Sequence, residues 1–162
     1  MMIMEINKIV CIQNNQEQHW CRYLRDWHQI PVFITSDGRE SRSALYHDGT
    51  SFFIVGGSLI KASNEGYMLN RLWHEVAHLF YRDVWKPWDI RFEYRADLVA
   101  AGATSRNLTL SRLYALKKTA SDPKVSDYLD KRLENLYGTP NVYTKESAVY
   151  MLGHLKPVTV LN

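Results

Sequence analysis

Two histidines and a glutamate stand close together in the run His74-Glu75-Val76-Ala77-His78. His74 and His78 are four residues apart, so in a helix both imidazoles project from one face and can bind one metal ion. Glu75 is turned by only about 100° from His74 around the helix axis. Its carboxylate can therefore reach a metal-bound water without being a ligand, which is the position that a general base requires. The run predicts a catalytic metal site in which Glu75 is the base.

Such a site needs a third protein ligand, because a hydrolytic zinc site holds three and leaves the fourth position to water. No histidine occurs between His78 and His154, which rules out a third histidine at short spacing. Glu93 is the better candidate, on a second helix that would pack against the first. Asp97, one turn later, can accept the free ring N–H of a ligating histidine. The sequence predicts Zn2+ as the cofactor, with His74, His78 and Glu93 as ligands and Asp97 beside them.

The helices that must position these residues can be read from apolar periodicity and capping residues. The first is predicted to begin at Ser63 or Asn64 and to end at about Arg82. Its apolar face is formed by Leu69, Leu72, Val76 and Leu79. Asp89 is predicted to cap the next helix, which ends near Gly102.

Three further helices are predicted towards the end of the sequence. They span about Thr109–Ala120, Pro123–Tyr137 and Lys145–Leu152. The middle one has the clearest boundaries, because Asp122 can cap it, proline occupies its first position and Gly138 follows its end.

A small sheet is predicted before the motif. Its strands are Val32–Thr35, residues 43–46 and Ser51–Val55, separated by turns at Asp37-Gly38 and at residues 47–49. An Asp-Gly pair between β-rich runs is a strong hairpin signal. We therefore expect an antiparallel sheet of about three strands.

An earlier helix is predicted between Asn14 and Pro31. Cys11 and Cys21, the two cysteines of the chain, are too few for a secreted disulfide framework and are interpreted as reduced thiols. Together these elements predict an α+β fold in one domain, residues 1–162. Its core spans about 14–105, with a helical C-terminal region at about 106–155.

Composition limits the classes of partner. The chain of 162 residues is 46% hydrophobic and 23% charged, as expected of a soluble globular protein. Its net charge is only +3, and its basic residues are scattered, so a nucleic-acid partner is not expected. The first ten residues lack the pattern of a signal peptide, and no stretch approaches the roughly 20 apolar residues of a membrane helix. These observations predict a cytoplasmic location and no membrane association.

The HExxH run together with Glu93 resembles the gluzincins, zinc peptidases with an HExxH helix and a separate glutamate helix. The order of helix, small sheet, HExxH helix, glutamate helix and helical tail, over about residues 20–105, is similar to the ImmA/IrrE-type peptidases of phages and mobile elements. Those enzymes usually carry E-x-x-A-N/R. Glu93-x-x-Ala96-Asp97 is closer to the E-x-x-x-D of HtpX-like and CAAX-prenyl peptidases, which are membrane proteins.

The resemblance implies a zincin-like fold and a soluble zinc metallopeptidase that hydrolyses a protein or peptide substrate. Known ImmA/IrrE-type members are intracellular and cleave repressor proteins. The strand at 52–55 could pair with an extended substrate along its edge, which makes Phe53 and Ile54 candidate substrate-binding residues. Tyr143, Tyr150 and His154 are candidates for the oxyanion-stabilising donor, and the sequence does not choose among them.

Two alternatives belong to other functional classes. One is a binding or assembly protein that keeps zinc as a structural element, and the other is a regulator that senses zinc or DNA without cleaving. Glu75 argues against the first, because a structural site has no use for a base at that position. The substrate and the oligomeric state are left open.

Overall fold

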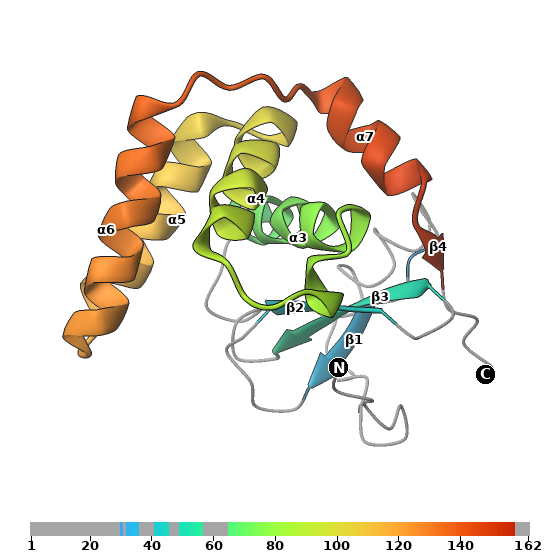
Figure 1. Cartoon of the computed structure of the whole chain (residues 1–162), viewed down its shortest axis with the longest axis horizontal. Helices are drawn as coiled ribbons and strands as arrows, with labels where there is room; N and C mark the ends of the chain where they lie inside the picture. Colours follow the sequence, from blue (N-terminus) through green and yellow to red (C-terminus); the bar gives the residue numbers. More distant parts are fainter. Residues whose placement is uncertain (1–29, 31, 36–40, 46–48, 57–64, 158–162) are drawn as a thin grey trace.

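The helix α3 (Glu65–Phe80) lies at the centre of the protein, between a small sheet and the helix α4 (Ile90–Ala103). A computed structural model describes residues 30, 32–35, 41–45, 49–56 and 65–157. Figure 1 shows the sheet against one side of α3, with a helical hairpin at one end and a last helix at the other. The protein is an α+β chain in which helix predominates.

The two helices predicted to carry the site are confirmed. Asp89 caps α4 as predicted, because its side chain accepts a hydrogen bond from the backbone N–H of Arg91. Ala96 and Ala100 are fully buried on α4 and let its backbone approach its neighbours closely. A 3-10 turn, η2 (Asp83–Trp85), joins the two helices.

The three C-terminal helices are also confirmed, with small changes at their boundaries. They are α5 (Arg106–Thr119), α6 (Pro123–Gly138) and α7 (Lys145–Gly153). The end of each helix differs from the prediction by one residue. Helix α5 begins three residues earlier than predicted, because the side chain of Ser105 caps it by accepting a hydrogen bond from the N–H of Leu108.

The prediction of an antiparallel sheet is wrong, because the sheet is mixed. Its strands are β1 (Val32–Thr35), β2 (Ser41–Leu45), β3 (Thr50–Gly56) and β4 (Lys156–Pro157). Strands β1 and β4 pair parallel with β3, and β2 alone pairs antiparallel with it. The predicted β2–β3 hairpin therefore forms, whereas the predicted pairing of β1 with β2 does not.

The central position of β3 also corrects the predicted substrate edge. Phe53 pairs with Val32 on one side and Ser43 on the other, and Ile54 is likewise paired on both sides. Both side chains are buried. Phe53 and Ile54 therefore offer no free strand edge, and the predicted addition of a substrate strand along them is wrong. A continuous apolar run is typical of such an inner strand.

Two apolar clusters fill the interior, and α4 contributes to both. The larger lies between the sheet, α3, α4 and α7, and includes Phe53 and Val76. The smaller packs α4 against α5 and α6 around Leu113 and Leu136. Gly102 allows the segment before α7 to lie against α4, since a Cβ there would be 2.5 Å from the carbonyl oxygen of Tyr143.

Several predictions concern residues outside the described part of the chain. They are the helix between Asn14 and Pro31, the two cysteines, the Asp37-Gly38 turn and the cap at Ser63 or Asn64. Among the described residues, no helix has the length and apolar character to span a membrane.

Candidate metal centre

Three ligand atoms converge where α3 faces the first turn of α4. The Nε2 atoms of His74 and His78 are 3.1 Å apart. The Oε2 atom of Glu93 lies 2.9 Å from the first of these nitrogens and 3.4 Å from the second. The helical spacing of the histidines and the position of Glu93 after the Asp89 cap produce this arrangement. The group could hold a metal ion.

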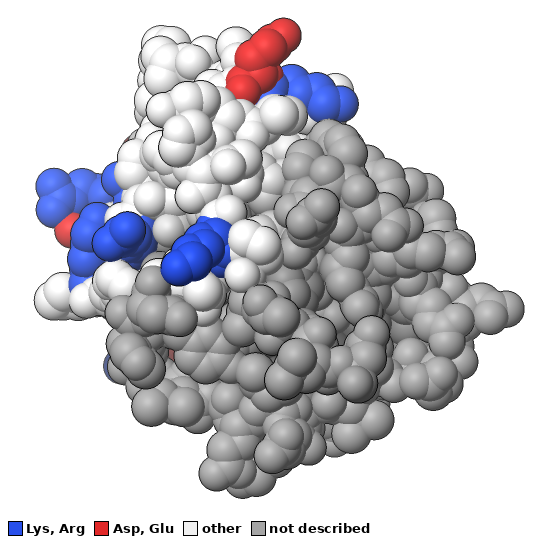
Figure 2. Space-filling model, turned by 90° about the vertical axis from the view of Figure 1, so that its right-hand side faces the viewer, with Lys and Arg blue, Asp and Glu red and all other residues white. Residues whose placement is uncertain are grey.

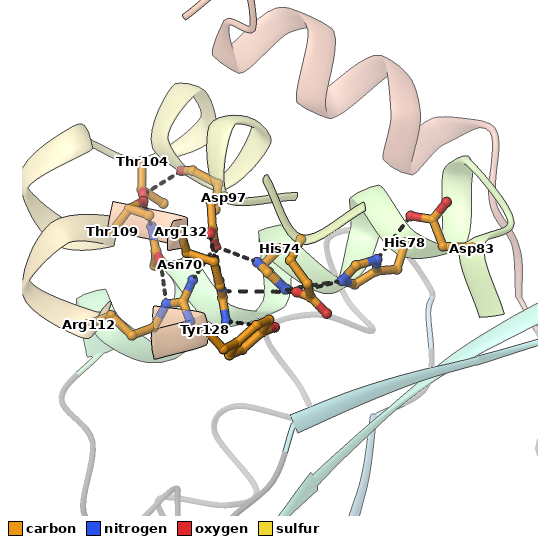
Figure 3. Close-up of polar contacts among 12 residues, drawn as sticks. Asn70, His74, His78, Asp83, Asp97, Thr104, Thr109, Arg112, Tyr128 and Arg132 are labelled. Atoms are coloured by element: carbon orange, nitrogen blue, oxygen red, sulfur yellow. Dashed lines mark hydrogen bonds and ion pairs between the residues drawn. The ribbon is translucent and has the colours of Figure 1, made fainter. Parts of the chain in front are cut away.

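The other ring nitrogen of each histidine contacts a carboxylate. His74 Nδ1 lies 3.0 Å from Asp97 Oδ1, and His78 Nδ1 lies 3.0 Å from Asp83 Oδ2 (Figure 3). A carboxylate beside Nδ1 favours the tautomer that carries its proton there, which leaves the Nε2 lone pair free for a metal. The structure therefore brings Asp97 to the position expected from the sequence.

Asp83 is a site residue that the sequence analysis missed. Arg82, the residue before it, has a left-handed backbone (φ 57°), and this turn directs the chain after α3 back towards His78. Arg95 on α4 donates a 2.5 Å hydrogen bond to Asp83 Oδ1, and its guanidinium lies 3.6 Å from the ring centre of Tyr81. The carboxylate that contacts His78 is thus anchored from both helices.

Asp97 accepts hydrogen bonds from two buried arginines in addition to its contact with His74. Arg132 donates from Nε to Oδ2 and from Nη2 to Oδ1, at 2.8 and 2.7 Å. Arg112 donates from Nη2 to Oδ1 at 3.2 Å. These arginines come from α6 and α5, and neither was predicted to belong to the site.

The charges favour a cation between the ligand atoms. Burial lowers the pKa of His78, but hydrogen bonds with Asp83 and Glu93 outweigh this effect and raise the pKa to about 10. Burial raises the pKa of Glu93, whereas its hydrogen bonds with the two histidines dominate and hold that pKa far below its usual range. Likewise burial raises the pKa of Asp97, but its arginine and histidine partners lower it overall. The same carboxylates would attract a metal ion, which would replace the proton of His78 on binding.

Glu75 is placed beside the converging atoms and is not one of them. Its side chain is buried on α3, and it lies close enough for its charge to act on His78 and on Arg71. Glu93 keeps 18% of its side chain exposed, so solvent reaches the cluster from that side. The arrangement provides two imidazole nitrogens and one carboxylate oxygen as donors, with a separate carboxylate beside them.

The three candidates for an oxyanion donor make contacts elsewhere. The hydroxyl of Tyr143 lies 3.2 Å from that of Tyr81. The rings of Tyr150 and His154 stack with centroids 4.0 Å apart, beside Phe80. The described contacts therefore do not connect any of the three with the histidine pair.

We expect Asp83→Asn to weaken metal binding by about 10–100-fold, which is the usual effect of losing the partner of a ligating histidine. The amide keeps the shape of the carboxylate but loses the charge that orients His78. Competition with a chromophoric chelator measures the affinity. Asp127→Asn, an exposed change on α6, is the control. Equal affinities for the two variants would show that Asp83 does not support the site.

Comparisons of the chain with protein-family models, with curated proteins and with solved structures gave no match in any of the three. The residues that converge in space are therefore the basis for assigning a function. They are His74, His78 and Glu93, with Glu75 beside them, in an arrangement compatible with a metal site of the HExxH type.

Proposed function

We propose that the protein is a zinc-dependent peptidase of the gluzincin type, in which His74, His78 and Glu93 hold the zinc ion and Glu75 is the catalytic base. The observation that carries this proposal is the triangle formed by the three ligand atoms. Its sides are 2.9, 3.1 and 3.4 Å. Ligand atoms bound at about 2.0–2.1 Å to a tetrahedral zinc ion lie about 3.3 Å from one another. The side chains fit that geometry with little movement.

The donor set alone fits more than one metal, because two histidines and one carboxylate also bind iron in oxygenases. Glu75 favours hydrolysis, since proton transfer at a water is the task that a carboxylate in this position can perform. Bound zinc would lower the pKa of a water molecule towards neutrality and polarise the carbonyl of a substrate. Glu75 then accepts the proton of the attacking water and passes it to the leaving amine. Asp97 and Asp83 hold the two imidazoles in orientation throughout.

An extended peptide can bind along β2 rather than β3. Within the described residues, β2 (Ser41–Leu45) pairs with β3 on one side only, so its other edge is open to strand addition. It contacts both α3 and η2, the elements that carry His78 and Asp83. A substrate strand on β2 would therefore run beside the helix that holds the metal ligands.

A protein substrate also agrees better with the surface charge than a nucleic acid does. In the described part of the face shown in Figure 2, Lys and Arg side chains stand in separate groups among uncharged residues, and some of them lie beside Asp or Glu. A nucleic-acid site would need a continuous basic stripe. We therefore propose a peptide or protein substrate in solution, and repressor-like proteins of phages or mobile elements are the first to assay.

The test combines metal analysis with a cleavage assay. The purified protein should contain about one zinc ion per chain and should cleave members of a peptide library. A chelator should stop cleavage, and adding back zinc should restore it. Protein that keeps one zinc ion per chain but cleaves neither peptides nor whole-proteome samples would instead be a binding or regulatory protein with a structural zinc site. Protein that binds iron in preference to zinc would contradict the proposal at its first step.

A further inference from the structure

We propose that Arg112 and Arg132 are positioning residues of the metal centre, which hold His74 in place through Asp97. The helical hairpin α5–α6, which supplies both arginines, is then part of the centre rather than an appendage to it. This inference uses the metal site of the proposed function but does not depend on hydrolysis.

Both oxygens of Asp97 are engaged, and this fixes the orientation of the carboxylate. Arg132 forms a two-pronged pair with it, at 2.8 and 2.7 Å, which is the strongest and most directional arginine–carboxylate arrangement. Oδ1, the oxygen that contacts His74, accepts from Arg132 and Arg112 as well. Any rotation of the carboxylate away from the imidazole would break these bonds.

Arg112 is itself tied to the helix that carries the ligands. Its Nε donates to Asn70 Oδ1 at 2.8 Å, and Asn70 lies one turn before His74 on α3. The amide of Asn70 donates to the hydroxyls of Thr104 and Thr109, at 2.9 and 2.8 Å. Figure 3 shows this chain of contacts running from α3 through the arginine to Asp97 and back to His74. The network is a closed loop, so its members constrain one another.

The cluster of Asp97, Arg112 and Arg132 differs from an ordinary ion pair at a helix surface because it is buried. The side chains of Asp97, Arg112 and Arg132 are 1, 5 and 6% exposed. The pair between Lys117 and Asp130 also joins α5 to α6, but its side chains are 38 and 51% exposed. Arg132 Nη2 lies 4.0 Å from Glu93 Oε2, so the same guanidinium faces a second ligand. An arginine whose only role was to hold α5 against α6 would not need to contact both Asp97 and Glu93.

The two histidines therefore differ in how firmly they are held. The partner of His78 is Asp83, whose own partners Arg95 and Lys86 are 27 and 47% exposed. The partner of His74 is held by two buried arginines. We expect His74 to be the rigid ligand of the pair.

The experiment compares Arg132→Lys with Lys117→Met, which removes the exposed α5–α6 ion pair and serves as the matched control. Lysine keeps the positive charge but lacks the planar fork that binds both oxygens. Zinc alone is the probe, and its affinity is measured by competition with a chelator, with urea unfolding run alongside. We expect Arg132→Lys to lower the affinity by about 10-fold or more, within the range for such indirect partners, and Lys117→Met to leave it unchanged. Arg112→Lys should show a smaller loss, and it carries the test if Arg132→Lys does not fold.

Two further measurements separate positioning from simple stabilisation. In metal-free protein, imidazole nitrogen NMR should show His74 protonated at Nδ1 in the wild type and a mixture of tautomers in Arg132→Lys. In an Asp97→Asn background, Arg132→Lys should cause no additional loss of zinc affinity, because lysine keeps the positive charge that faces Glu93, and the effect of losing the planar fork passes through Asp97. Wild-type affinity and an unchanged tautomer in the folded arginine variants would overturn the inference. If instead the wild type proved to bind no zinc, the proposed function would fail while the tautomer measurement still tested the role of Arg132.

Discussion

Glu75→Gln is expected to lose hydrolysis by about 10²–10⁴-fold, the usual cost of removing a general base. Glutamine has the shape of glutamate and can still hydrogen-bond a water, but it cannot accept a proton from it. Because Glu75 is not one of the three converging ligands, zinc content should remain close to that of the wild type. Cleavage rates on a peptide identified with the wild-type enzyme, together with metal analysis of both proteins, give the measurement.

Glu134→Gln on α6 is the matched control, because it makes the same chemical change at an exposed position. It should cleave at the wild-type rate. Equal rates for Glu75→Gln and the wild type would remove Glu75 from the mechanism. A variant that lost its zinc together with its activity would show that Glu75 supports the metal and is not only a base.

Alanine at any of the three ligand positions should remove most of the bound metal. Each of His74, His78 and Glu93 supplies one of the three donor atoms, and a site with two protein donors holds zinc weakly. The loss in affinity should exceed the roughly 100-fold that is typical for a partner of a ligand, since here the ligand itself is lost. Metal content after gel filtration and chelator competition provide two independent readouts.

Glu134→Ala controls for the loss of a carboxylate in general, and we expect it to keep the wild-type metal content. The informative variant is Glu93→Ala, since Glu93 is the ligand that no short motif identifies. If this variant kept its zinc while Asp83→Ala or Asp97→Ala lost it, the carboxylate ligand would have been assigned to the wrong residue.

The residues that the sequence predicted well are those placed by a single helix. His74, Glu75 and His78 follow from helical spacing, and the relation between Glu93 and Asp97 follows from one further turn of helix. Their convergence needed only that two adjacent helices pack together. Local periodicity carries that information, and the structure brings the ligand atoms together as expected.

Asp83 could not be predicted because its position depends on one backbone angle. Arg82 adopts a left-handed conformation that few residues other than glycine adopt, and nothing in its identity indicates this. The contact between Asp83 and His78 follows from that turn and from the hydrogen bond that Arg95 on α4 donates to Asp83. Sequence periodicity indicates neither the turn nor this hydrogen bond.

The sequence around Arg132 does contain a signal for a buried charge. This arginine falls in the apolar stripe of α6 with Leu129, Leu133 and Leu136, all of them buried. A charged residue at a core position needs a buried partner of opposite charge. Lys131 and Arg132 are adjacent in the sequence, but Lys131 is exposed whereas Arg132 is buried against Asp97; helical periodicity distinguishes the two, and charge alone does not.

The error in the sheet has a similar origin. The Asp37-Gly38 pair is a local signal for a hairpin, whereas the position of β1 beside β3 is set by tertiary pairing. The unbroken run Phe52-Phe53-Ile54-Val55 indicated an inner strand with neighbours on both sides. This evidence for an inner strand should have outweighed the turn signal at Asp37-Gly38.

The buried cluster around Asp97 also dictates the order in which the protein can be assembled. Asp97 and Arg132 are 35 residues apart, and Arg112 reaches back 42 residues to Asn70. On the ribosome the two histidines emerge first, followed by Asp97, and Arg132 only after a further helix has been made. Closing such long loops costs entropy, so these contacts form after the local helices. Strand β4 pairs with the beginning of β3, so this contact can form only after the helices α3 to α7 between them have been synthesised.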